Sequence, residues 1–437
     1  MKIFVLGFIF CLFLQNTVFA IPLNINFFTR FNDIWLEKYI KEALENNHEL
    51  KKTTHVLEQY RQQIKTQFSK ELPNLSVSSN YLGAHFPKAD GNSFLLSKNS
   101  YILPFRVGYE PDFLLKNRDK TNSKKKLYEA QIHNQKSAYI SLLSDVASVY
   151  INILLLDYLI DKQIKILEDK SQNLSYSTGK FKFGVIDFIQ LNDKKEQLET
   201  QKIIYENLVK KQKTNLYNFA LLLGKSAYNS ENIQRGKLDE FEYIGSIPEI
   251  INSDLIYERP DIKEIEEKLK SAKIDIRVAK KEFLPSFNIT GFLAFDTAGG
   301  GNFFSWDSSF AYLVAGLTQD ILKGGEKIAN LRIKKARFME LLEEYKQKDL
   351  NAIKEINNSL NLIKQDKLIE KNYKKQLDYD KQNYDVSYKK LRNGIIAKTD
   401  FLADKTSLHQ TQQLFANSKA TRLVDYITLY KVLGGQL

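Results

Sequence analysis

The sequence predicts a mainly helical fold with a small β part, organised as two copies of one structural pattern. Its 437 residues contain only 8 Pro and 19 Gly, which favours long uninterrupted helices because these two residues usually end elements. From Ala138 to Leu167, apolar residues recur every three or four positions, as in a coiled-coil seam. Short stretches of alternating apolar and polar residues between the helical segments predict a few β-strands.

Residues 1–20 predict a cleaved signal peptide. Lys2 precedes an apolar run from Ile3 to Leu14, and Val18 and Ala20 occupy the third and first positions before the expected cleavage point. The apolar run is about 12 residues long, whereas about 20 are needed to span a bilayer as a helix. The single cysteine, Cys11, lies in this segment. The exported chain is therefore expected to contain no disulfide and no lipid-modified cysteine.

The rest of the chain repeats one order of elements. Leu72-Pro73 and Leu284-Pro285 each introduce a strand pattern after a charged helix, and Gly184 and Gly394 lie 210 residues apart. We therefore expect two repeats, 21–245 and 246–437, each with a helix, a strand pair and a long helical hairpin. The expected strand pairs are 75–86 with 101–112 and 286–296 with 309–320, and the expected hairpin tips lie near 181–187 and 391–400.

The strand expected over 286–296 has two unlike faces. Phe287, Ile289, Leu293 and Phe295 point to one side, and mostly polar residues alternate with them. Its length matches a tilted transmembrane strand, so we interpret the apolar side as lipid-facing. The alternative is a small soluble sheet packed against the helices. Four strands cannot close a membrane barrel, which needs about eight, so lipid-facing strands require an oligomer, and a trimer would supply about twelve.

Composition and motifs argue against several other classes of protein. The net charge of +12 could suit nucleic acid, but Lys alternates with Glu and Asp along the helices and forms no aromatic-studded basic patch. The five histidines do not cluster, and the glycines at 299–301 lack the strand and helix of a phosphate-binding loop. We therefore expect no nucleic-acid partner, no enzyme activity, no cofactor and no metal site.

Several motifs, taken in order, resemble the TolC family of outer-membrane efflux proteins. ERPDI at 258–262, the helix after it and Leu284-Pro285 are similar to the central linker of that family. YEPDFLLKNRDK from Tyr109 and LTQDILKGGEKIANLRIKKA from Leu317 are similar to its strand-to-helix exits. SYKKLRNGIIAKTDFLADKTSL from Ser387 resembles its helical tip. The resemblance covers most of the chain after residue 20.

The resemblance implies a homotrimer with a 12-stranded β-barrel in the outer membrane and a hollow α-helical barrel in the periplasm. It also implies an exit duct for small toxic compounds or drugs. The helical tips would meet a periplasmic adaptor protein and so connect the duct to an inner-membrane transporter. Two alternatives stay open: a duct for type I protein secretion, and a periplasmic coiled-coil scaffold or adaptor without a membrane barrel.

The candidate site residues lie at the two helical tips. Gly184 and Gly394 are expected where each hairpin reverses, because glycine adopts backbone angles that other residues avoid, and Asp187 follows the first of them. The resemblance implies that Asp400, six residues after Gly394, lines a periplasmic gate, where three carboxylates would favour cations. Alternatively, Asp400 is an acid stabilised at a helix start. Asp404, one turn later, is a second candidate for the gate.

Overall fold

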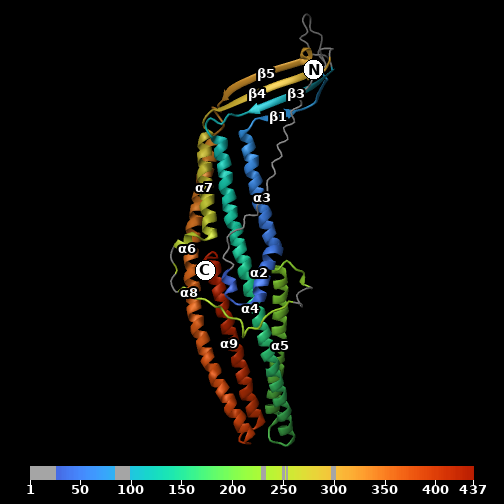
Figure 1. The fold of residues 1–437 in the computed structure, drawn as a ribbon, viewed down its shortest axis with the longest axis vertical. Coiled ribbons are helices and arrows are strands. Elements are labelled where there is room, and N and C mark those ends of the chain that lie inside the picture. Colours follow the sequence, from blue (N-terminus) through green and yellow to red (C-terminus); the bar gives the residue numbers. More distant parts are fainter. Residues whose placement is uncertain (1–25, 84–98, 228–232, 249–250, 252–253, 297–301) are drawn as a thin grey trace.

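The computed structural model describes residues 26–83, 99–227, 233–248, 251, 254–296 and 302–437. The molecule is elongated: long helices run along it, and a small sheet lies across one end (Figure 1). The prediction of a mainly helical fold with a small β part is confirmed. The signal peptide expected over 1–20 lies outside the described residues.

Two helical hairpins of equal size dominate the fold. Helices α4 (Lys116–Lys182) and α8 (Glu326–Arg392) each contain 67 residues. Helices α5 (Phe188–Leu222) and α9 (Lys398–Val432) each contain 35 residues. Each bound of the second hairpin lies 210 residues after its counterpart in the first, which confirms the internal repeat. A helix of 67 residues, such as α4 or α8, extends about 100 Å at about 1.5 Å per residue.

The shorter helices flank the half of the hairpins that is nearer to the sheet (Figure 1). They are α1 (Asn26–Thr29), α2 (Ile34–Asn46), α3 (His48–Phe68), α6 (Asp254–Tyr257) and α7 (Pro260–Lys281). Single 3-10 turns follow α3, at Ser69–Glu71, and precede β5, at Trp306–Ser308. Pro260 stands at the first position of α7, where a missing N–H costs nothing. Helices α3 and α7 precede the strands of the two repeats, and both pack beside α4.

The sheet is antiparallel, with the strand order β1-β3-β4-β5, and β2 also pairs with β3. Its strands are β1 (Asn74–Val77), β2 (Asn80–Gly83), β3 (Asn99–Tyr109), β4 (Ser286–Asp296) and β5 (Ser309–Thr318). The first strand, expected over 75–86, is divided into β1 and β2, and residues 84–86 lie outside the described residues.

Two strands end earlier than the sequence predicts. Strand β3 ends at Tyr109 instead of 112, because Pro111 has no N–H for the ladder and the Asp112 carboxylate accepts the backbone N–H of Lys116 at 2.7 Å, at the start of α4. Strand β5 ends at Thr318 instead of 320, because Asp320 turns to Lys323 and Lys327, at 3.2 and 3.3 Å.

The main hydrophobic core lies at mid-height, where the N-terminal helices meet the middle of α4 and the ends of α5 and α9. The ring of Phe27 stacks on that of Tyr430 with a centroid separation of 4.6 Å, and both side chains are fully buried. The Tyr150 hydroxyl of α4 donates to Asp33 at 3.1 Å, and Phe241, in the linker between α5 and α6, packs nearby. The N-terminal segment, the linker and both hairpins are therefore joined in one core.

Among the described residues, one helix, α4, contains a stretch long and apolar enough to cross a bilayer. Most of that stretch is buried against the neighbouring helices. Its apolar character is therefore explained by its position in the core of the fold.

Candidate functional site

The first candidate site is one face of the sheet. The register places Phe287, Ile289, Leu293 and Phe295 of β4 on the same face, as the alternation predicts. Their partners on both sides are apolar almost throughout. We call this set the apolar face: Leu75, Val77, Tyr81, Tyr101, Leu103, Phe105, Val107, Tyr109, Phe287, Ile289, Leu293, Phe295, Ala311, Leu313, Ala315 and Leu317.

No described helix covers the apolar face. Leu75, Leu313 and Leu317 are each more than 70% exposed. The described helices extend away from the sheet and do not lie across it (Figure 1). The alternative of a small sheet packed against the helices therefore does not describe this structure. A continuous apolar surface of this kind marks contact with lipid or with another protein chain.

The opposite face of the sheet mixes polar residues with apolar and aromatic ones. Asn288 and Thr290 are exposed there, as expected. Phe310, Tyr312 and Val314, a set that alternates clearly in the sequence, also lie on this face and not on the apolar face. Phe292 stacks on Tyr312 at 5.0 Å between ring centroids, and the guanidinium of Arg106 lies 5.7 Å from the Phe292 ring. The alternation of β5 therefore does not identify its apolar face.

Both edges of the sheet lack a strand partner within the described residues. Strands β1 and β2 form one edge and β5 forms the other. Unpaired backbone N–H and C=O groups are very unfavourable in the hydrocarbon of a bilayer, because no water is present to satisfy them. If the apolar face meets lipid, these edges must pair with other copies of the chain.

The second candidate site is formed by the hairpin tips. Gly184 and Gly394 both have φ of +70°, the left-handed region that favours glycine. At each tip the glycine N–H bonds the carbonyl three residues earlier, and the next N–H bonds the carbonyl five residues earlier, at 2.9–3.0 Å. This is the Schellman arrangement that ends a helix. Open space surrounds both glycines, so the backbone angle alone requires them.

The two tips differ at the start of the returning helix. Asp187 caps α5: its carboxylate accepts the N–H of Gln190 at 2.7 Å, and the Gln190 side chain accepts the N–H of Asp187 at 3.2 Å. The matching residue in the second repeat, Ala397, has no side chain that can cap α9. Asp187 therefore stabilises its own helix start, and its exposed position leaves it on the surface of the tip.

The two gate candidates have different surroundings. Asp400 lies in the first turn of α9 and is exposed, and its nearest polar contact is the adjacent Thr399 hydroxyl at 3.4 Å. Asp404 is half-buried and accepts a hydrogen bond from Ser387 of α8. The carboxylate of Asp404 therefore faces the α8–α9 seam, whereas that of Asp400 is free to face a neighbouring copy or the solvent.

The tips are connected by contacts between the repeats that sequence reasoning missed. Asn173 and Lys180 of α4 donate to the backbone oxygen and the hydroxyl of Thr399, at 3.2 and 3.1 Å. Further up, the fully buried Asp169 of α4 binds Lys405 of α9 at 2.7 Å. His409 lies 3.7 Å from the same carboxylate, and burial lowers its pKa below the usual range despite Gln412 and Asp169. No local pattern reveals partners this far apart in the chain.

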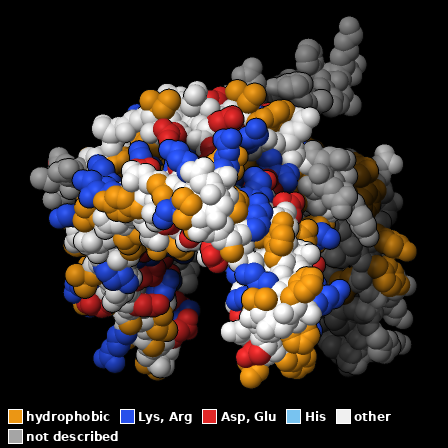
Figure 2. Space-filling model, turned by 90° about the horizontal axis from the view of Figure 1, so that it is seen from below, with side chains coloured by type: hydrophobic (Ala, Val, Ile, Leu, Met, Phe, Trp, Pro, Cys, Tyr) orange, Lys and Arg blue, Asp and Glu red, His pale blue; other side chains and the backbone are white. Residues whose placement is uncertain are grey.

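The first tip exposes many apolar side chains. Phe183 is 87% exposed, and Phe188 and Ile189 are also exposed. Seen from this end, hydrophobic side chains lie at the surface among charged side chains, and an open gap separates two lobes (Figure 2). The run FKFGVIDFI at 181–189 could have revealed this patch, because a hairpin turn exposes most of its residues.

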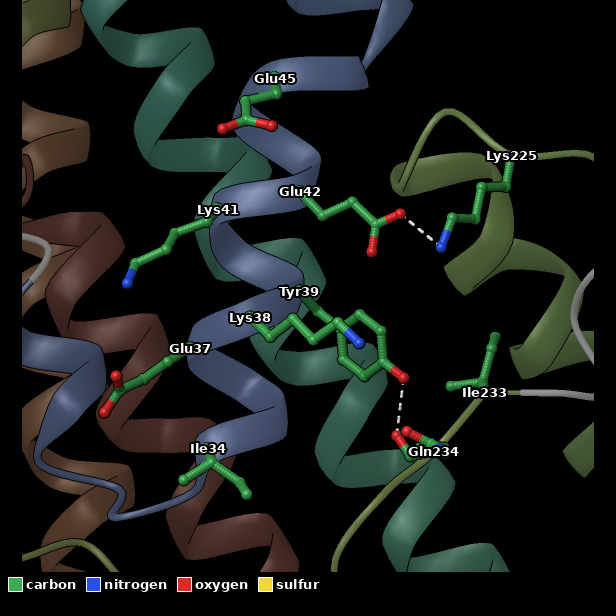
Figure 3. A pocket seen from close by; sticks show the side chains of 10 residues that line it. All are labelled: Ile34, Glu37, Lys38, Tyr39, Lys41, Glu42, Glu45, Lys225, Ile233 and Gln234. Atoms are coloured by element: carbon green, nitrogen blue, oxygen red, sulfur yellow. Dashed lines mark hydrogen bonds and ion pairs between the residues drawn. The ribbon is translucent and has the colours of Figure 1, made fainter.

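A surface cavity of about 850 Å³ lies beside α2 (Figure 3). Glu42 pairs with Lys225 across it, and the Tyr39 hydroxyl donates to the carbonyl of Gln234 at 2.7 Å. Its wall carries charges of both signs, among them Glu37, Lys41 and Glu45 beside the Glu42–Lys225 pair. Within the described residues, no group of three or more His, Cys, Asp or Glu is arranged to hold a metal ion.

In the described part of the chain, a sheet with one apolar face and two open edges is joined to helices of about 100 Å, which defines the class of protein: a channel subunit of the outer membrane, of the TolC type. The chain belongs to the outer membrane efflux protein family, whose family model matches residues 39–225 and 252–435.

Individual relatives agree with this family. The cation efflux system protein CusC of Escherichia coli is 24% identical over 427 residues, 94% of this chain and 89% of CusC. The toluene efflux pump outer membrane protein TtgC of Pseudomonas putida is 24% identical over 414 residues, 93% of this chain and 84% of TtgC. The crystal structure of the Campylobacter jejuni CmeC outer membrane channel superposes with a TM-score of 0.85 at 22% identity, covering 94% of this chain and 88% of CmeC.

Proposed function

We propose that three copies of this chain form the exit duct of a tripartite efflux machine, through which small toxic compounds leave the cell passively. The duct would span the outer membrane with a shared barrel of about twelve strands and extend into the periplasm as a hollow helical barrel. A periplasmic adaptor and an energised inner-membrane transporter would complete the pathway.

The observation that carries the proposal is the sheet with an exposed apolar face and two open edges. In lipid, each edge must find a partner strand, and only ring closure provides one for every edge. Pairing β5 of one copy with β1 and β2 of the next is a head-to-tail contact, which forms a ring if the rotation closes. Three copies reach the strand number that a small membrane barrel needs. Phe287, Ile289, Leu293 and Phe295 would then face the lipid.

The helices and tips support the partners. A helix of about 100 Å carries the tips far from the membrane, towards proteins anchored in the opposite membrane. The exposed Phe183, Phe188 and Ile189 form an apolar surface at that end, which suits docking of an adaptor. Gly184 and Gly394 would shape the two turns that meet it.

The cargo is proposed as small toxic compounds, because the relatives carry the names of efflux pumps and not of protein-secretion ducts. Their names refer to cargo as different as cations and toluene. A duct that handles such different molecules contacts them loosely, so selection of the cargo is assigned to the inner-membrane transporter.

We assign the periplasmic gate to Asp400 in preference to Asp404. Asp400 is exposed, and its carboxylate contacts the adjacent Thr399, whereas the carboxylate of Asp404 accepts a hydrogen bond from Ser387 within the hairpin. Thr399, next to Asp400, is held by Asn173 and Lys180 of the other hairpin, which fixes the position of this carboxylate. The matching position of the first repeat is Gln190, so a trimer would carry three such acids and not six.

Electron microscopy of the detergent-solubilised protein tests the duct. We expect a threefold particle with a long helical barrel and a shorter β-barrel. Membranes washed in high salt should retain the protein, and detergent should release it. A monomer that washes off in salt would contradict the proposal and favour a periplasmic scaffold.

Single-channel recording in planar bilayers tests the gate. Asp400→Asn should lower the preference for cations over anions, because it removes a carboxylate ring from the narrowest point. Asp404→Asn is the matched control and should leave this preference close to that of the unmodified channel. The reverse result would transfer the gate to Asp404.

A further inference from the structure

The positive charge of the chain is concentrated just below the sheet. We call the segments 61–72, 110–126, 275–286 and 318–337, which join the sheet to α3, α4, α7 and α8, the basic collar. They contain 18 Lys and Arg against 8 Asp and Glu, a net charge of +10 out of +12 for the whole chain. The remainder of the molecule is nearly neutral, so this concentration is a local property of the junction.

The collar lies at the depth of lipid headgroups if the sheet spans the bilayer, an assumption that comes from the proposed function. Strand β4 has 11 residues, or about 36 Å of extended chain at about 3.3 Å per residue. Tilted by about 40°, such a strand covers about 28 Å of depth, close to the hydrocarbon thickness of a bilayer. The four collar segments, which adjoin the strands at the periplasmic end of the sheet, therefore lie in the headgroup layer of the periplasmic leaflet.

A pocket of about 280 Å³ connects the apolar face to the collar. Phe287 and Leu317, both members of the apolar face, line it together with Phe113, Lys116 and Lys281. Phe113 is 76% exposed and meets the ring of Phe287 edge-on at 5.7 Å. The pocket therefore offers an apolar wall continuous with the lipid side and an ammonium group at its headgroup end.

The charged groups around this pocket keep some hydrogen-bonding capacity beyond their contacts within the chain. Lys116 binds one carboxylate, Glu110, at 2.7 Å, and both side chains stay partly exposed. Asp112 is occupied by the backbone N–H groups of Lys116 and Arg118, at 2.7 and 2.8 Å. A lysine ammonium has three donors, so Lys116 can bind a further acceptor oxygen beside Glu110.

The carboxylate of Asp119, in the adjoining turn of α4, is already paired with two cations. Asp119 is buried and accepts hydrogen bonds from Arg277 and Lys281, both at 2.6 Å. Burial acts to raise the pKa of Asp119, but these two cations hold it below its usual range. Asp119 therefore remains a carboxylate shared between two cations.

We propose that the basic collar binds the headgroup phosphates of anionic phospholipids in the periplasmic leaflet, with Lys116 as a direct ligand and one acyl chain lying over Phe113, Phe287 and Leu317. Each basic residue near an anionic membrane surface strengthens the attraction, and a trimer carries the collar three times. The site would hold the barrel at a fixed depth and favour membranes rich in anionic lipid.

The test uses the purified full-length protein in zwitterionic detergent, melted in the presence of dioleoylphosphatidylglycerol or dioleoylphosphatidylcholine. A ligand that binds only the folded state raises the melting temperature, so phosphatidylglycerol should stabilise the protein more than phosphatidylcholine. Lys116→Gln should weaken this preference, measured as the ratio of the two apparent Kd values, about five-fold. Lys116→Arg should retain it.

A variant that should change the lipid preference in the opposite direction distinguishes lipid binding from a structural role of Lys116. Glu110→Gln removes the carboxylate that competes for Lys116, so it should increase the preference for phosphatidylglycerol, although it breaks the same ion pair as Lys116→Gln. Lys202→Gln and Glu199→Gln disrupt an exposed pair of 2.8 Å on α5, remote from the sheet, and should change nothing.

Three results would overturn the inference: equal stabilisation by the two lipids, equal stabilisation by inorganic phosphate, or an unchanged preference in Lys116→Gln. In each case a threefold particle that needs detergent would leave the duct itself intact. Failure of the duct gives a different result, a protein that is a monomer and soluble without detergent.

Discussion

The two hairpins have the same helix lengths and the same turns, yet they are buried very differently. Leu143 of α4 is fully buried, whereas Ile353, at the matching position of α8, is 39% exposed. Ile427 of α9 is fully buried, whereas Tyr217, its match on α5, is 48% exposed. Helices α4 and α9 pack against each other across the repeats, and α5 and α8 lie on the flanks (Figure 1).

This difference teaches that repetition of the backbone does not determine which surfaces are covered. The covered helices are those at the junction between the repeats. The flanking helices, α5 and α8, keep exposed apolar residues such as Ile203 and Leu350. Residues such as these are available for contact with neighbouring copies of the proposed trimer.

The largest expected effect separates matched positions of α4 and α8. Leu143→Ala should lower the free energy of unfolding by about 4 kcal/mol, because it leaves a cavity in the core. Ile353→Ala should cost about 1 kcal/mol if its site is as exposed in the assembly as in the single chain. Denaturant titration in detergent, followed by circular dichroism, measures both. Equal costs would show that α8 is buried against another copy.

Three glycines that end long helices give the next largest effect. Gly184, Gly224 and Gly394 all have φ of +70°, but a Cβ on Gly224 would meet the backbone oxygen of Asn46 at 2.5 Å. Gly224→Ala should therefore cost about 3 kcal/mol, from the backbone angle and the clash together. Gly184→Ala and Gly394→Ala should cost about 1 kcal/mol each. Similar losses of stability at all three sites would show that the structure around Gly224 accommodates a Cβ as easily as the exposed tips do.

A pair of acids distinguishes the hairpins in their pH dependence. Burial, and then the hydrogen bond and charge of Asp366, raise the pKa of Asp425 on α9 to about 7. A carboxyl with a raised pKa in the folded state favours folding while it is protonated, and this contribution disappears as the pH rises through about 7.

Between pH 4 and pH 8 the free energy of unfolding of the unmodified protein should therefore fall by about 2 kcal/mol more than that of Asp425→Asn. This value is smaller than the full pKa shift implies, because solvent screens part of the interaction. The first repeat already has Asn215 at the matching position. Denaturation at a series of pH values measures the difference, and a variant with the same pH slope as the unmodified protein would refute the assignment.

The smallest expected effect compares the caps at the two tips. Asp187→Ala should cost about 1 kcal/mol of local stability at the start of α5, because the N–H of Gln190 loses its acceptor. Ala397→Asp should stabilise the start of α9 by a similar amount. Hydrogen exchange of the first-turn amides reports both changes in opposite directions. No change in the second variant would show that the tip of α9 is held by its contacts with α4 instead.

Particular residues show how far sequence reasoning reached. The alternation over 286–296 places Phe287 and Phe295 on one face, because side-chain direction in a strand depends only on the parity of the residue. The same reasoning does not locate the apolar face of β5, where the more conspicuous set, Phe310 and Tyr312, lies on the opposite face. Only the pairing register with β4 assigns that strand.

The sequence by itself determined the features that depend on near neighbours: the helical seam, the two copies 210 residues apart, the left-handed turns at Gly184 and Gly394, and the alternating face of β4. The tertiary structure alone decided which helices are covered and which charges meet, as with Asp169 and Lys405. The physical reason is that backbone angles and periodicity are local, whereas burial and ion pairing depend on segments that come together only when the chain folds.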